Sequence, residues 1–177
     1  MTPKPDATTL DACCGGKMFH FAKDNPDVLF ADNRRETLKY DRTPPHGKWI
    51  TIAPDLLADF RALPFPDARF RVVIFDPPHL VRVGAKSFLS LKYGKLDTDY
   101  QTQLRAGFHE CFRVLKPHGL LIFKWSEVQI PLSRILPLAP HKPLIGQRCG
   151  KNANTHWLIF KKPAPAAQTK IEKPKNP

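Results

Sequence analysis

The sequence lacks the features that define several large classes of protein. It contains no apolar run of the roughly 18 to 20 residues that a membrane-spanning helix requires, so we expect no membrane association. The first ten residues, MTPKPDATTL, include no apolar segment of a secretory signal, which favours the cytoplasm. The four cysteines include no C-x-x-C pair, so we expect free thiols and neither a disulfide framework nor a metal site.

Two phosphate-binding signatures are also absent. The chain has neither G-x-G-x-x-G nor G-x-x-x-x-G-K-[ST], the glycine-rich loops that bind dinucleotides and nucleoside triphosphates. It shows no internal repeat either. A ligand that carries a chain of phosphates is therefore disfavoured.

The composition that is present suits one globular domain. The 177 residues are 42% hydrophobic and 25% charged, which is enough apolar material for a single core. We expect one domain over residues 7–162, preceded by a flexible segment, residues 1–6. Residues 163–177 are rich in Pro, Ala and Lys and contain almost nothing to bury, so we expect a disordered basic tail.

Positive charge exceeds negative charge by a wide margin. Lys and Arg number 28 against 16 acidic residues, a formal net charge of +12 at pH 7. Basic residues that neutralise phosphates release counterions, so this balance favours a polyanionic partner. Ordinary solubility explains the same charge equally well.

Short apolar runs alternate with loops and one amphipathic segment. Strands are predicted at TTLDA, VLFAD, the region WITIAPDLLADFRALPF, RVVIFD, GLLIFKW and THWLIFKK. Apolar residues at helical spacing from Leu104 to Leu115 predict a helix that Pro117 and Gly119 end, and PLSRILPLA predicts a shorter one. Residues 39–48 are too proline-rich for a helix and are expected to form a loop. The alternation indicates an α/β fold with a mostly parallel central sheet.

Glycine, acidic and aromatic residues follow four of the predicted strands. Ligands of an open parallel sheet bind beyond the carboxyl ends of its strands, so these positions are candidate site residues. Caps and turns explain each group when it is taken alone, but together they form a consistent set. The set contains Asp11, Ala12, Cys13, Cys14, Gly15 and Gly16, then Asp32, then Asp59 and Phe60, then Asp76, Pro77, Pro78 and His79.

This set suits a cofactor that contains a nucleoside without a phosphate chain. Glycines after the first strand let a ligand approach the backbone closely. An acidic residue about 20 positions later, here Asp32, accepts hydrogen bonds from both ribose hydroxyls and would repel a ribose phosphate.

The order of DACCGG, VLFAD, DFRALPF, FDPPHL and FRVLKPHGLLIFKW resembles the class I S-adenosylmethionine-dependent methyltransferases. FDPPH resembles the D-P-P-(Y/F/W/H) signature of the branch that methylates amino groups, and the chain is similar to small stand-alone enzymes of phages and prophages. The resemblance covers roughly residues 9–162. It implies a Rossmann-like sheet with an antiparallel last strand, helices on both faces, and S-adenosylmethionine as the cofactor.

The resemblance also implies roles for individual residues. Asp11, Cys13 and Gly15 would line the methionine end of the cofactor, Asp32 would bind the ribose, and Asp59 with Phe60 would contact the adenine. Ala12, Cys14 and Asp76 complete the expected cofactor site. The chain departs from the family in its glycine loop, where Cys13-Cys14-Gly15-Gly16 replaces G-x-G.

The Asp-Pro-Pro-His segment suits methyl transfer to an exocyclic amine. Such an amine is a poor nucleophile, because its lone pair is delocalised into the ring. The Asp76 carboxylate and the Pro77 carbonyl can accept its two N–H groups while positive charge develops on the nitrogen. Pro77 and Pro78 hold the backbone rigid, and His79 can stack on the base. The alternative is a rigid turn that has no catalytic role.

Basic and aromatic residues follow this segment and form the expected substrate site. Cations interleaved with aromatic rings suit a flipped or unpaired base, although a lid that closes over the pocket without a polymer explains them as well. The expected substrate-binding residues are Arg82, Lys86, Lys92, Tyr93, Lys95, Lys124, Trp125, Asn154 and His156. Asn154 and His156 are equally consistent with turn caps.

We therefore expect an S-adenosylmethionine-dependent N-methyltransferase that acts on a nucleic-acid base, with adenine N6 in DNA or RNA preferred. The alternatives are guanine N2, cytosine N4 or protein glutamine as the acceptor, or a nucleic-acid-binding module without activity. The chain has no room for a separate target-recognition domain. Recognition would therefore rest on its loops or on a protein partner.

Overall fold

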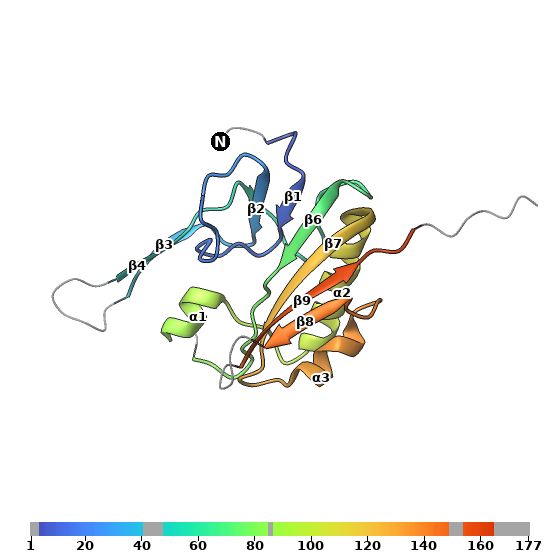
Figure 1. The fold of residues 1–177 in the computed structure, drawn as a ribbon. Coiled ribbons are helices and arrows are strands. Elements are labelled where there is room, and N and C mark those ends of the chain that lie inside the picture. Colours follow the sequence, from blue (N-terminus) through green and yellow to red (C-terminus); the bar gives the residue numbers. More distant parts are fainter. Residues whose placement is uncertain (1–3, 41–47, 85–86, 149–153, 165–177) are drawn as a thin grey trace, which may run out of the picture.

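The computed structural model describes residues 4–40, 48–84, 87–148 and 154–164, and Figure 1 shows their arrangement. A seven-stranded sheet with the order β5-β2-β1-β6-β7-β9-β8 forms its centre. Its strands are β1 (Thr9–Asp11), β2 (Val28–Asp32), β5 (Leu56–Leu57), β6 (Phe70–Phe75), β7 (Leu115–Ser126), β8 (Ile145–Arg148) and β9 (Thr155–Lys161). Strands β5, β2, β1, β6 and β7 pair in parallel, and β9 runs antiparallel to both of its neighbours. The expected mostly parallel sheet with an antiparallel last strand is confirmed.

The parallel strands form where apolar β-branched and aromatic residues follow one another, because such side chains pack well on a pleated surface. The register aligns Leu10 of β1 with Val73 of β6, and Val73 with Leu121 of β7. All three side chains are fully buried, so this row forms the middle of the core. The carboxyl ends of these strands are thereby brought to one edge of the sheet.

The long helix α2 (Tyr100–Val114) packs against this core. Its buried residues include Leu104, Phe108 and Cys111, at the spacing that predicts one apolar face. The helix approaches the sheet closely at Gly107, where an added Cβ would lie 2.7 Å from Phe75 Cζ of β6. It ends at Val114, and the extended backbone of Leu115 begins β7, so the predicted stop signals Pro117 and Gly119 lie within a strand.

The other helical elements are short. They are α1 (Phe88–Tyr93), α3 (Leu132–Ile135) and the 3-10 turn η1 (Leu136–Leu138). Figure 1 shows α2 and α3 on the same side of the sheet. The expected helices on the second face are not found among the described residues, because the connections from β1 to β2 and from β2 to β5 contain turns and strands instead. At β2, the second face of the sheet is covered by His20, and the centre of its ring lies 4.8 Å from the centre of the Phe30 ring.

Some boundaries differ from those predicted. The region expected to be one strand divides into β4 (Lys48–Ile52) and β5, and β4 pairs with β3 (Glu36–Tyr40) in a separate antiparallel ribbon. The ends of the predicted loop 39–48 therefore lie in strands, and residues 41–47 lie outside the described part. Strands β3 and β8 and helix α1 were not predicted from the sequence.

At the N-terminus, Lys4 lies in the segment expected to be flexible, but its ammonium is 2.8 Å from Asp55 Oδ2 and donates to two backbone carbonyls. Of the predicted tail 163–177, the structure describes residues 163 and 164 alone. In the described ranges, no helix is long and apolar enough to span a membrane.

Candidate active site

Residues at the carboxyl ends of β1, β2, β6 and β7 line a cavity of about 440 Å³. This size is within the range of sites that bind small molecules and cofactors. Many residues of the predicted site meet in its wall: Ala12, Cys13, Cys14, Gly15, Gly16, Asp32, Phe60, Asp76, Pro78, His79, Lys92, Tyr93, Lys95 and Lys124. Their assigned roles remain predictions.

The glycine loop after β1 forms one wall of the cavity. Gly15 has φ of +48°, and a Cβ placed on it would meet nothing within 4 Å, so the backbone here is open to a ligand. The loop is tied to the sheet because Ala12 N donates to Ile74 O and Cys14 N donates to Ala31 O. It therefore forms a firmly held cradle despite its departure from G-x-G.

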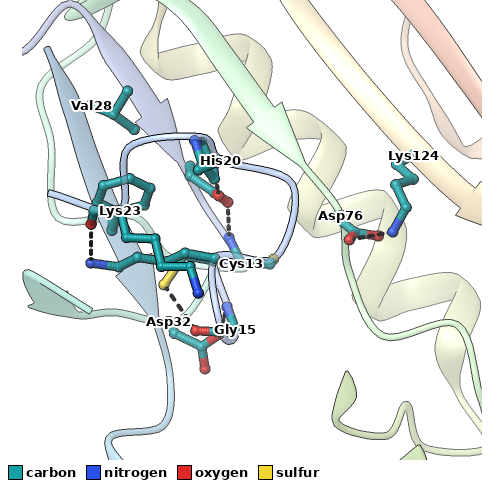
Figure 2. A network of polar contacts seen from close by, with 12 residues as sticks. Cys13, Gly15, His20, Lys23, Val28, Asp32, Asp76 and Lys124 are labelled. Atoms are coloured by element: carbon teal, nitrogen blue, oxygen red, sulfur yellow. Dashed lines mark hydrogen bonds and ion pairs between the residues drawn. The ribbon is translucent and has the colours of Figure 1, made fainter. Parts of the chain in front are cut away.

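Asp32 connects this loop to the end of β2. Its Oδ2 accepts a hydrogen bond of 2.9 Å from Gly15 N, which Figure 2 shows. Its Oδ1 accepts one of 3.0 Å from Arg34 N. Arg34 Nε also lies 3.5 Å from Oδ1. Each carboxylate oxygen has two lone pairs, so the carboxylate keeps capacity for further hydrogen bonds, above all at Oδ2. Asp32 lines the cavity, and the geometry therefore fits a ribose with two free hydroxyls.

Asp11 differs from the predicted role, because it does not line the cavity. Its side chain is fully buried, Oδ2 lies 2.8 Å from His20 Nε2, and Oδ1 accepts from Cys13 N. Burial raises the pKa of Asp11, and the contact with His20 opposes this rise. Asp11 therefore holds the segment after the glycine loop in place, and a contact with the cofactor is not supported.

The two cysteines of the loop line the cavity as neutral groups. Burial raises the pKa of the Cys13 and Cys14 thiols above their usual range, and nearby carboxylates add to the effect. A protonated thiol is a weak nucleophile, so neither cysteine is expected to react at neutral pH.

Asp76 stands directly after β6, on another part of the wall. Its Oδ2 accepts a hydrogen bond of 2.7 Å from Lys124 Nζ at the end of β7, as Figure 2 shows. Among the described residues, Lys124 is the only hydrogen-bond partner of this carboxylate. Burial raises the pKa of Asp76 to about 6, although Lys124 acts in the opposite direction. At pH 7 the side chain is therefore mostly ionised, with Oδ1 available as an acceptor.

His79 lies beside Asp76 in the cavity wall. Burial lowers its pKa to about 4, and the charge of Lys124 adds to this effect. The ring is therefore neutral at pH 7 and lies 5.3 Å from the ring of Tyr93. Pro78 also lines the cavity, whereas Pro77 is buried behind the wall. A neutral ring beside Tyr93 offers an aromatic surface for a planar acceptor.

Two other predicted site residues, Asp59 and Trp125, are not part of the cavity wall. Asp59 does not line the cavity, because its carboxylate pairs with Arg61 at 2.5 Å, which lowers the pKa of Asp59. Its neighbour Phe60 does line the cavity. Trp125 is fully buried and its indole N–H donates to Ile130 O, so it supports His79 from within the core, with the ring centres 6.4 Å apart.

The remaining predicted substrate residues lie elsewhere. Outside the cavity, the Arg82 backbone N–H donates to the Gln129 side-chain Oε1, and Gln129 Nε2 donates to the Arg82 carbonyl. His156 Nε2 lies 3.0 Å from Glu127 Oε1, which fits the alternative of a local structural role. Asn154 accepts from Glu127 N through its backbone carbonyl. Lys86 lies outside the described residues.

Several lining residues escaped the sequence analysis. These are Met18, Phe19, Asn33, Arg34, Gly94, Ser126 and Thr155. Asn33 and Arg34 directly follow a strand that had been recognised, so their position was a usable signal. Phe19 packs edge-on against Trp157 at 5.5 Å, a contact between distant segments that no local pattern reveals. No metal-binding group of three or more His, Cys, Asp or Glu residues occurs in the described part of the chain.

No protein-family model matches the chain. It is 29% identical over 141 residues to the ubiquinone/menaquinone biosynthesis C-methyltransferase UbiE of Paraburkholderia phytofirmans, covering 78% of this chain and 50% of that protein. It is 30% identical over 111 residues to UbiE of Laribacter hongkongensis, covering 61% of this chain and 38% of that protein. The chain thus spans about half the length, or less, of these curated relatives.

Solved structures of low sequence identity share the fold of this chain. TrmN from Thermus thermophilus matches with a TM-score of 0.56 and 13% identity, covering 89% of this chain and 44% of that one. A TehB-like SAM-dependent methyltransferase from Corynebacterium glutamicum matches with a TM-score of 0.51 and 13% identity, covering 92% and 83%. Together with the strand order and the antiparallel β9, these matches identify the fold as that of the class I S-adenosylmethionine-dependent methyltransferases.

Proposed function

We propose that this protein is an S-adenosylmethionine-dependent methyltransferase whose acceptor is an exocyclic amino group of a nucleic-acid base. The observation that carries the proposal is that one cavity is lined both by the glycine wall with Asp32 and by Asp76, Pro78 and His79 of the Asp-Pro-Pro-His segment. The names of the matched relatives support the general activity, and the Asp76 segment supports the type of acceptor.

The glycine wall would hold the cofactor. Asp32 has acceptor capacity for the ribose hydroxyls, the Gly15 backbone leaves space for the methionine part, and Phe60 offers an aromatic ring. When bound, S-adenosylmethionine supplies a methyl group activated by a positively charged sulfur. Because the Cys13 and Cys14 thiols are neutral, the carboxylates of Asp32 and Asp76 are the negatively charged groups among the residues that line the cavity.

Asp76 would orient the acceptor amine. Its free Oδ1 can accept one N–H, which aims the nitrogen lone pair and stabilises the positive charge that grows there. Lys124 holds Oδ2 and thereby fixes the carboxylate in one orientation. The neutral His79 ring and Tyr93 would stack on the base.

Transfer to a carbon atom is the second candidate. It is favoured by the UbiE relatives, which are named as C-methyltransferases and therefore argue against an amine more than for one. A carboxylate with a pKa of about 6 is also suited to remove a proton from an acidic carbon or phenol. The cavity alone is compatible with both chemistries.

Labelled methyl transfer distinguishes the two candidates. The purified chain is incubated with S-adenosylmethionine carrying a tritiated methyl group and, separately, with DNA, RNA, protein and a bacterial lipid extract that contains quinone precursors. We expect label in nucleic acid, recovered as a methylated amino base by nucleoside mass spectrometry. Label confined to the lipid fraction would reject the amine acceptor and support the carbon acceptor.

A further inference from the structure

The β3–β4 hairpin is an unusual connection between two parallel strands. Strands β2 and β5 pair in parallel, and such a connection usually contains a helix that covers the sheet. Here β3 and β4 instead form a ribbon of their own, which Figure 1 shows extending away from the body. A two-stranded ribbon has little stability of its own. Ile52, at the base of the hairpin, is deeply buried. The described strand residues farther out are exposed or half-buried, so they contribute little to the core.

The base of this hairpin lies at the cavity. Arg34, two residues before β3, lines the cavity and donates to Leu91 O of α1. On the other strand, Thr51 O lies 3.7 Å from the Cβ position of Gly16, which also lines the cavity. Trp49 is two residues farther out, which corresponds to about 7 Å along a strand. The hairpin therefore begins at the rim of the site.

The outer face of the hairpin carries an exposed aromatic side chain. Trp49 is 64% exposed, whereas Trp125 is buried and Trp157 is half-buried. Trp49 is paired with Lys39 across the ribbon, and both side chains are exposed on the same face as Thr37 and Thr51. A solvent-exposed aromatic ring can stack on an unpaired base, and a neighbouring cation attracts phosphates.

Cations also lie on the other side of the cavity mouth. Lys92 and Lys95 line the cavity at the end of α1 and just after it, and the Arg34 side chain joins this region to the base of the hairpin. The chain as a whole carries a net charge of +12. A polyanionic strand that crosses the mouth would therefore meet positive charge near α1 and an aromatic platform on the hairpin.

We propose that the β3–β4 hairpin is a nucleic-acid-binding arm that holds the single strand next to the target base, with Trp49 stacking on an unpaired base. This inference rests on the proposed nucleic-acid acceptor. The arm would supply part of the recognition of the nucleic acid.

The test compares three full-length variants with the wild type. Trp49→Ala removes the platform, Trp49→Phe keeps an aromatic ring, and Leu144→Ala removes an exposed apolar side chain outside the cavity wall. Affinity for a fluorescein-labelled 12-nucleotide single strand is measured by anisotropy. We expect Trp49→Ala to weaken binding about 5- to 100-fold, as for the loss of one base stack. Trp49→Phe should retain most of the affinity, and Leu144→Ala should match the wild type.

Two further measurements separate the possible failures. Calorimetry should give the same cofactor affinity for Trp49→Ala as for the wild type, and thermal melts should coincide, because the side chain is exposed. If the wild type methylates nucleic acid but Trp49→Ala binds the strand equally well, the arm is rejected and the proposed function stands. If the wild type neither binds nor methylates nucleic acid, the proposed acceptor fails and the arm fails with it.

Discussion

The two halves of the cavity hold their carboxylates in different ways. On the glycine wall, Asp32 accepts hydrogen bonds from two backbone N–H groups, and the nearby Asp11 is fully enclosed. On the other half, Asp76 is held by the single side chain of Lys124. Figure 2 shows the two groups well separated. Backbone donors hold the first carboxylate in a preformed cradle. The second carboxylate is held through Oδ2 alone, which leaves Oδ1 to bind the molecule that receives the methyl group.

The largest expected effect comes from Asp76. Asp76→Ala should lower the rate of methyl transfer at least about 100-fold, because positioned carboxylates commonly contribute this much or more. Cofactor affinity measured by calorimetry should change little. The exposed Asp24→Ala serves as the control and should leave the rate unchanged. Substantial activity in Asp76→Ala would show that the second half of the cavity does not do the chemistry.

The reverse pattern is expected for Asp32. Asp32→Ala should weaken cofactor binding about 10- to 100-fold, the loss expected when hydrogen bonds to a charged group disappear. The rate at saturating cofactor should fall much less. Asp59→Ala is the matched variant, because its carboxylate pairs with Arg61 outside the cavity, and its cofactor affinity should stay near the wild-type value. Equal losses in both variants would contradict the assignment of the ribose site.

The pH dependence of transfer should report on the Asp76–Lys124 pair. The rate should fall as the pH drops through about 6, because Asp76 then gains a proton and loses its charge. Lys124 lowers the pKa of Asp76, so Lys124→Met should raise that pKa and move the acidic limb upward by about one pH unit. His79 remains neutral down to about pH 4 and should add no second limb near 6. An unmoved limb in Lys124→Met would assign the titration to another group.

The smallest expected effect concerns the cations at the mouth. Replacing both Lys92 and Lys95 by Gln should weaken nucleic-acid binding several-fold at low salt. It should also flatten the dependence of log affinity on log salt by about two, one for each phosphate that the variant no longer neutralises. Binding is measured by anisotropy over a range of salt concentrations. A steep slope that persists in the double variant would place the phosphate-binding residues on another surface.

Local patterns predicted the strands and the residues at their ends well. Val28–Asp32 forms a strand with the predicted bounds, and Asp76 lies directly after β6 at the cavity. The prediction failed where a contact between distant segments decides the outcome. Trp49 to Ile52 looked like part of a central strand, because its apolar residues suit any strand, but β4 pairs with β3 instead. Local propensity does not specify the partner of a strand.

The sequence by itself determined the class of fold, the sheet edge at which the cavity lies, and the Asp-Pro-Pro-His segment at that edge. These follow from short-range properties, namely apolar runs that form strands and proline or glycine residues that end them. Only the tertiary structure decided which acidic side chains face the cavity. Asp32 and Asp76 face it, whereas Asp11 turns to His20 and Asp59 to Arg61. The direction of a side chain depends on the hydrogen-bond partner that folding brings within reach, and a partner such as Lys124 lies 48 residues away from Asp76 along the chain.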